Sequence, residues 1–164
     1  MNITEAKENI SSLYEKALNK CADSSRTHPI RIIQAVKSVI GINKDNPIEE
    51  LLTFCEKYVN TFESKNVDFS IDESSISEMI SYKNLEEALV NLDGPLAQQR
   101  AYELSRVSEG MQIIEFLLEF SFKYSKTSAF LIWSIYRMML FLDKQFMLKS
   151  ILVCVKSILS SQEI

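Results

Sequence analysis

The chain has 164 residues, of which 46% are hydrophobic and 24% are charged. This length and apolar content suit one folded domain with a core and exclude a disordered chain. Three glycines and three prolines are about 4% of the chain against a usual level of roughly 12%, which argues against a turn-rich β-sandwich or barrel.

Three helices are predicted in the first third of the chain, because apolar residues recur there every three or four positions. They span about residues 2–21, 27–41 and 47–63. Their start signals are the capping box of Asn2 and Glu5, Pro29 in a first turn, and the segment Asn46-Pro47-Ile48-Glu49. Gly41 is expected to end the second helix.

The middle of the chain predicts shorter elements. Residues 64–71 lack a helical period and are expected to form a loop that places apolar side chains in the core. Ser70 and Glu73 form a capping box for a short helix whose apolar face is Ile76, Met79 and Ile80. Asn84 is the expected cap of the next helix, which the segment Asp93-Gly94-Pro95 ends.

Four further helices are predicted at about residues 96–107, 111–125, 128–142 and 144–160. Apolar residues cover most of the circumference of 111–125 and 128–142, so both are expected to be buried on several sides. The run 128–142 is shorter than the roughly 20 residues of a membrane-spanning helix and contains Arg137. No membrane span is therefore expected.

Together these patterns predict an all-α fold: one domain, 1–164, forming a bundle of eight or nine helices. Acidic helices occupy 45–93, and hydrophobic core helices occupy 96–160. Short solenoid-like stacking of helix pairs is compatible with the same pattern.

Charge is concentrated in one segment. Residues 45–93 contain three lysines and twelve acids, a net charge of −9, whereas the flanking segments 1–44 and 94–164 carry +3 and +2. Such a segment repels nucleic acid and attracts a basic protein surface. The alternative is that many of these acids stabilise first helical turns, by about 0.3–1 kcal/mol each. The acids placed in first turns are Glu49, Glu50, Asp72, Glu73, Glu86 and Glu87.

Signals of catalysis are weak. The single histidine, His28, precedes a proline at a helix start and is expected to be a capping or loop residue. The sequence contains no zinc-protease, CxxC, phosphate-loop or G-x-S-x-G motif. Glu115 and Glu119 share a helix face, either as a solvated stripe or as a buried acid pair beside Arg137. We therefore expect neither an enzyme, nor a metal, nor a cofactor.

Two further features bear on location and ligand class. The three cysteines are far apart on apolar stripes, and the first ten residues lack a basic segment followed by an apolar one, which favours free buried thiols and a cytoplasmic protein. The second helix and its flanks carry too few basic residues to predict nucleic-acid binding. It consists of Arg26, Arg31, Lys37 and Lys44.

The predicted function is a small acidic helical protein that binds and neutralises a basic protein partner. Its most concrete form is an immunity or antitoxin-type inhibitor that covers the substrate cleft of a toxin such as a nuclease. The predicted partner-binding residues are Asp68, Phe69, Asp72, Glu73, Glu78, Tyr82, Glu86 and Glu87. Phe69 and Tyr82 are aromatic anchors or, alternatively, core residues. A helical-repeat adaptor for an apolar peptide and a self-associating subunit are the competing hypotheses.

Overall fold

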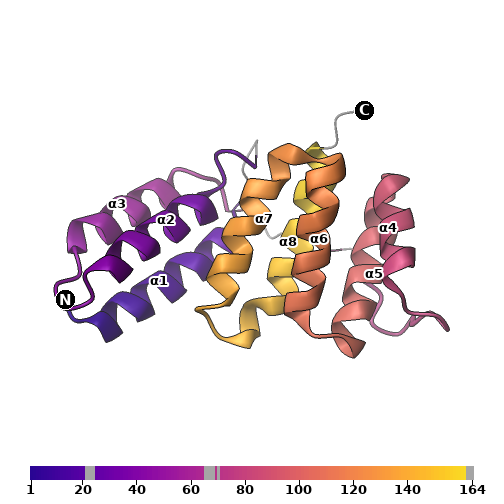
Figure 1. Ribbon diagram of the computed structural model, residues 1–164, viewed down its shortest axis with the longest axis horizontal. Helices are drawn as coiled ribbons and strands as arrows, with labels where there is room; N and C mark the ends of the chain where they lie inside the picture. The colour runs from indigo at the N-terminus through magenta and orange to yellow at the C-terminus, as the bar shows by residue number, and fades with distance from the viewer. Residues whose placement is uncertain (21–24, 65–68, 70, 162–164) are drawn as a thin grey trace. The chain divides into compact units, whose positions relative to one another are not determined.

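The computed structural model describes residues 1–20, 25–64, 69 and 71–161 (Figure 1). These residues form eight α-helices, one 3-10 turn and no strand, which confirms the predicted all-α class. The chain divides into two compact units, Met1–Val67 and Asp68–Ile164. Organisation as one domain and solenoid-like stacking stay predictions. No helix in the described part of the chain has the length and apolarity needed to cross a membrane.

The first unit is a three-helix assembly. Helices α1 (Ile3–Leu18), α2 (Pro29–Ile42) and α3 (Glu49–Asn60) lie side by side, and each packs against the other two (Figure 1). The predicted capping box is confirmed, because Glu5 N–H donates to Asn2 Oδ1 and Asn2 N–H donates to Glu5 Oε2, both at 2.9 Å. This box fixes where α1 begins.

Helices α1 and α3 each end three residues earlier than predicted, at Leu18 and Asn60, and two predicted boundary residues are wrong. Gly41 lies inside α2, which continues to Ile42. Helix α3 begins at Glu49 rather than near residue 47, and Asn46 does not cap it, because the N-cap is Ile48, which makes no side-chain cap bond. Pro47 is buried, so apolar contact, not a polar cap, fixes the entry into α3.

His28 caps α2, as predicted. Its Nδ1 accepts a hydrogen bond from Ile30 N–H at 3.4 Å, and the side chain is buried. Burial lowers the pKa of His28 to about 4, because the charged imidazolium is poorly solvated there. His28 is therefore neutral at pH 7 and can accept the capping bond.

The second unit is centred on α8 (Met147–Ser161), which follows a 3-10 turn at Lys144–Phe146. Four helices of this unit pack against α8. They are α4 (Tyr82–Val90), α5 (Gly94–Val107), α6 (Gly110–Tyr124) and α7 (Lys126–Met139). Residues 150–155 of α8 are all buried. This stretch contains only one serine, one cysteine and aliphatic residues, because the neighbouring helices surround it.

The prediction that residues 128–142 are buried on several sides is confirmed for most of α7, which packs against both α6 and α8. One face of α7 is nevertheless exposed, with Phe130 at 64% and Trp133 at 46%, and Leu140, just beyond the helix, is 63% exposed. Ser134 is buried, and its hydroxyl donates to the Phe130 carbonyl at 2.8 Å. Because α6 and α8 both pack against α7, its exposed side chains lie on the face turned away from these two helices.

Helix α4 ends at a residue with an unusual backbone conformation. Asp93 N–H donates to the Ala88 carbonyl at 3.0 Å and Leu92 N–H donates to the Leu89 carbonyl at 3.2 Å. This is the Schellman pattern, whose C′ residue adopts the left-handed conformation. That residue is Leu92, with φ of 57°. Asp93 was predicted to end this helix, but its side chain caps α5 by accepting from Leu96 N–H at 3.1 Å.

Replacing Leu92 with glycine should stabilise the second unit by about 0.5–1 kcal/mol, because glycine adopts a positive φ without steric strain. Leu92→Ala keeps the Cβ atom and should give no gain. Urea unfolding followed by fluorescence of Trp133, the only tryptophan, measures both variants. A destabilised glycine variant would show that the Leu92 side chain stabilises the fold by more than the backbone strain destabilises it.

Acidification should destabilise the first unit through His28. The folded pKa of about 4 lies below the ordinary 6.5, so the unfolded chain binds the extra proton between these values. The contribution of neutral His28 to the free energy of unfolding is fully present above pH 6.5 and is lost as the pH falls towards 4. The free energy of unfolding should drop by about 2 kcal/mol between pH 7 and pH 5. Amide exchange of buried α2 residues at several pH values measures this loss.

His28→Asn is the matched control, since asparagine caps a helix equally well but does not titrate. The variant should lose the pH dependence between pH 5 and 7. An unchanged pH profile in this variant would assign the acid sensitivity to other groups.

Candidate functional site

The segment 71–81 is an irregular loop, so the short helix predicted there is wrong. Side chains of α5 pair with its backbone. Gln99 Oε1 accepts from Asp72 N–H at 2.9 Å, and Gln99 Nε2 donates to the carbonyls of Asp72 and Ser75 at 3.1 and 2.7 Å. These bonds satisfy backbone N–H and C=O groups of the loop that a helix would otherwise pair internally. One face of α5 therefore determines the backbone conformation of the loop.

Glu103 is the second α5 residue that holds this loop. Its carboxylate accepts from Ser77 N–H at 3.1 Å, from the Ser77 hydroxyl at 3.2 Å and from Arg100 Nη1 at 2.7 Å. The Glu103 side chain is only 2% exposed, whereas Arg100 remains 24% exposed. A carboxylate this buried requires such partners.

The pKa of Glu103 reports the balance of these contacts. Burial raises it, but hydrogen bonds from Arg100, Ser77 and Gln99 lower it by more, and the net shift is downward. Glu103 is therefore ionised at neutral pH. A charged group inside this small network makes the position of the loop depend on Arg100 and Ser77 together.

Asp72 forms a tight local turn instead of a helix start. Its Oδ1 accepts from Ser74 N–H at 2.9 Å and from the Ser74 hydroxyl at 2.6 Å. These two hydrogen bonds lower the pKa of Asp72, so the carboxylate is ionised. Ser70, the predicted cap of the short helix, lies outside the described residues.

The N-cap of α4 lies three residues before the expected cap, Asn84. Ser81 is the N-cap, because its hydroxyl accepts from Asn84 N–H at 3.2 Å. Asn84 instead donates through Nδ2 to the Met79 carbonyl at 2.8 Å. Glu86 and Glu87 consequently fall in the second turn. First-turn stabilisation therefore does not account for these two acids, nor for Asp72 and Glu73 in the loop.

Most of the predicted acidic residues are exposed. Asp72, Glu73 and Glu78 lie on the loop and Glu87 on α4, all four exposed, while Glu86 is half-buried. Within the described part of the chain, the one ion pair that these five acids make joins Glu87 to Lys83 at 3.8 Å. Asp68 lies outside the described residues.

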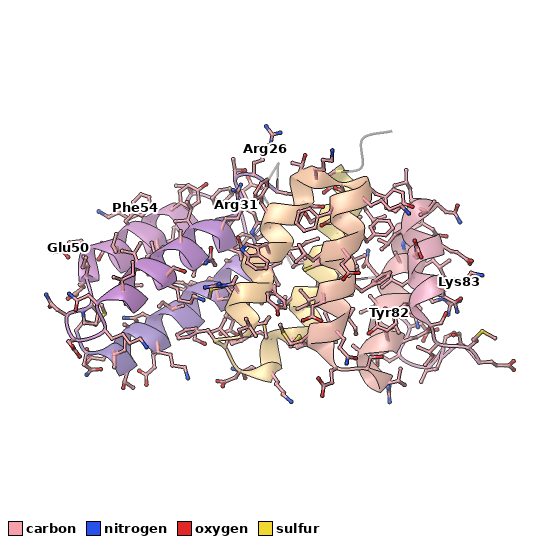
Figure 2. The ribbon with its side chains drawn as sticks, viewed as in Figure 1. Arg26, Arg31, Glu50, Phe54, Tyr82 and Lys83 are labelled. Atoms are coloured by element: carbon pink, nitrogen blue, oxygen red, sulfur yellow. The ribbon has the colours of Figure 1, made fainter. Side chains whose placement is uncertain are left out.

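The two predicted aromatic anchors occupy different surroundings. Tyr82 lies on the side of α4 that faces the rest of the unit, whereas Lys83 lies on the outer side (Figure 2). The Tyr82 ring packs on Phe116 of α6 with ring centroids 5.1 Å apart. These contacts support the core-packing alternative for Tyr82, and its role as an anchor stays a prediction.

Phe69, the other predicted anchor, is half-buried beside an open groove of about 690 Å³. The groove is lined by both apolar and polar residues, among them Phe69, Ile71 and Leu96 and also Asp72, Asp93 and Gln99. The structure thus brings Phe69 and Asp72 together. It adds Asp93, which the sequence analysis treated only as a helix-ending residue.

The Glu115 and Glu119 pair is exposed on α6. The Tyr136 hydroxyl donates to Glu115 Oε1 at 3.2 Å. The buried acid-pair alternative is therefore wrong.

Two of the three cysteines, Cys55 and Cys154, are free and buried as predicted. Burial raises the pKa of the Cys55 thiol to about 11 and raises that of Cys154 further. Cys21 lies outside the described residues. Among residues 1–20, 25–64, 69 and 71–161, no cluster of histidine, cysteine or acidic side chains is arranged to hold a metal ion.

Gln99 and Glu103 were missed by the sequence analysis. Leu96 and Val107 are apolar yet 38% and 64% exposed, while the charged Glu103 is buried. One signal was present in the sequence: Arg100 and Glu103 are three positions apart, a spacing that places opposite charges side by side on a helix.

Comparison with known proteins gave no relative, since no protein family, curated protein or solved structure matches this chain. Its function therefore has to be argued from its own residues.

Removing the Glu103 carboxylate should destabilise the second unit by about 2–4 kcal/mol, because Arg100 and the Ser77 N–H lose a charged partner. Glu103→Ala tests this in urea unfolding. Glu109→Ala, at an exposed glutamate that makes no side-chain cap bond, is the control and should change stability by less than about 0.5 kcal/mol. Equal effects would show that the buried contacts of Glu103 contribute no more to stability than an exposed glutamate does.

Proposed function

We propose that this chain is a protein-binding protein that neutralises a basic protein partner through the acidic surface formed by the 71–81 loop and α4. The observation that carries the proposal is the exposure of Asp72, Glu73 and Glu78 on a loop that α5 holds in place. Among the described residues, none of these three carboxylates is paired with a lysine or arginine. They are therefore available to an external cation.

The net charge of the surrounding segment supports the same partner class. Residues 71–93 contain six acids and one lysine, and the lysine already pairs with Glu87. A field of this sign accelerates encounter with a basic surface by roughly 10- to 1000-fold at low salt. It disfavours a nucleic acid, whose phosphates carry the same sign.

The concrete form of the proposal is an immunity or antitoxin-type inhibitor. A toxin that cuts RNA or DNA needs a basic cleft, and an acidic protein seated over that cleft excludes the substrate sterically and electrostatically. The partner would then lose nuclease activity when mixed with this chain in equimolar amounts. A captured basic protein without nuclease activity would contradict this form while leaving the binding function intact.

The binding function is tested by neutralising three acids at once. Glu73→Gln, Glu78→Gln and Glu86→Gln remove charge from the proposed surface. Glu109, Glu115 and Glu119, changed together to Gln, give a control with the same net charge on a different part of the unit. Each protein is immobilised and used to capture partners from the native cell at low and then high salt.

The expected result is one basic protein held by the wild-type chain and the control variant at low salt and released at high salt. With that protein purified, its association rate with the surface variant should fall about tenfold at low salt, and the salt dependence should weaken. Equal binding of the surface variant, or capture of no basic protein, would contradict the proposed function.

A further inference from the structure

We propose that the groove beside Phe69 receives an arginine side chain of the partner, so that it is the anchoring pocket within the wider acidic surface. This inference rests on the proposed function for its partner class. It goes further by naming one recognised side chain and one binding position.

The groove offers two carboxylates that make no ion pair with a lysine or arginine among the described residues. Asp72 Oδ1 accepts hydrogen bonds from Ser74, and Asp93 Oδ1 accepts one from Leu96 N–H. The Ser75 N–H also hydrogen-bonds the Asp72 carboxylate and contributes to its lowered pKa. Each aspartate is thus held in place by local hydrogen bonds, and a carboxylate has enough lone pairs to accept a guanidinium N–H as well.

The apolar part of the lining suits the rest of an arginine side chain. Phe69, Ile71 and Leu96 line the groove, and Leu96 is 38% exposed. An arginine packs its aliphatic stem on such a surface, and its planar head can stack on an aromatic ring. Lysine fits less well, because its ammonium group neither stacks in this way nor donates a planar fork of hydrogen bonds.

The groove is also held in shape before any partner binds. Gln99 lines it and binds the backbone of Asp72 and Ser75. Asp93 is fixed as the cap of α5. A pocket whose charged groups are already ordered loses less entropy on binding, which favours it as an anchoring point over the freer glutamates of the loop.

The test uses N-acetyl-arginine methylamide as the probe and its uncharged isostere, N-acetyl-citrulline methylamide, as the control. Both are titrated into the ¹⁵N-labelled full chain and followed by NMR. The arginine compound should shift the amides of Asp72 and Leu96 and the side-chain amide of Gln99. The citrulline compound should shift none of them, and the lysine analogue should bind more weakly.

Asp72→Asn combined with Asp93→Asn should weaken binding of the arginine compound about tenfold. Asparagine keeps the cap of α5 and the turn at Ser74, and far-ultraviolet circular dichroism verifies the fold. Glu119→Gln is the control of equal chemistry outside the groove and should bind the probe normally. Absence of shifts, equal shifts with citrulline or lysine, or shifts that persist in the double variant would overturn the proposal.

The experiments can contradict the arginine pocket and the proposed function independently of each other. If the partner protein binds the double asparagine variant with unchanged affinity but requires Glu73, Glu78 and Glu86, the arginine pocket is wrong and the proposed function stands. If the probe occupies the groove and no basic protein is captured, the proposed function is wrong.

Discussion

The buried carboxylate of Glu103 is the contact on which the acidic surface depends. It joins α5 to the Ser77 backbone and hydroxyl while Arg100 compensates its charge. Replacing both ionic partners with well-packed apolar residues is often neutral for stability in proteins. Here, however, apolar residues would leave the Ser77 N–H without its acceptor. The pair therefore specifies where the loop lies as much as it adds stability.

The sequence predicted the helices well because helix formation here follows local patterns. The capping box at Asn2 and Glu5 and the cap at His28 involve residues within three positions of each other, and both were found. The errors at Gly41 and Asn46 have one physical cause. Glycine allows a helix to end at its position, and asparagine allows one to start. Tertiary packing decides whether the helix actually ends or starts there.

The candidate site was harder to predict because its geometry is not local. Asp72 and Gln99 are 27 residues apart, and Ser77 and Glu103 are 26 apart. The sequence predicted the acids and their sign, but a capping box at Ser70 and Glu73 competed with the true loop. Nothing in the local pattern shows that side chains of a later helix will pair with that backbone. For the same reason Asp93 was recognised as a helix boundary and not as part of a groove.

The local hydrogen bonds of the acidic side chains also determine how each of them can contribute to the proposed binding. A carboxylate on a free loop gains little from an exposed ion pair, since ordering its side chain offsets most of the attraction. Asp72 and Asp93 are already ordered, one by Ser74 and the other by Leu96 N–H. Glu73 and Glu78 have no comparable restraint among the described residues. The two groups should therefore contribute differently: the glutamates chiefly to the rate of encounter, and the two aspartates chiefly to how long a complex lasts.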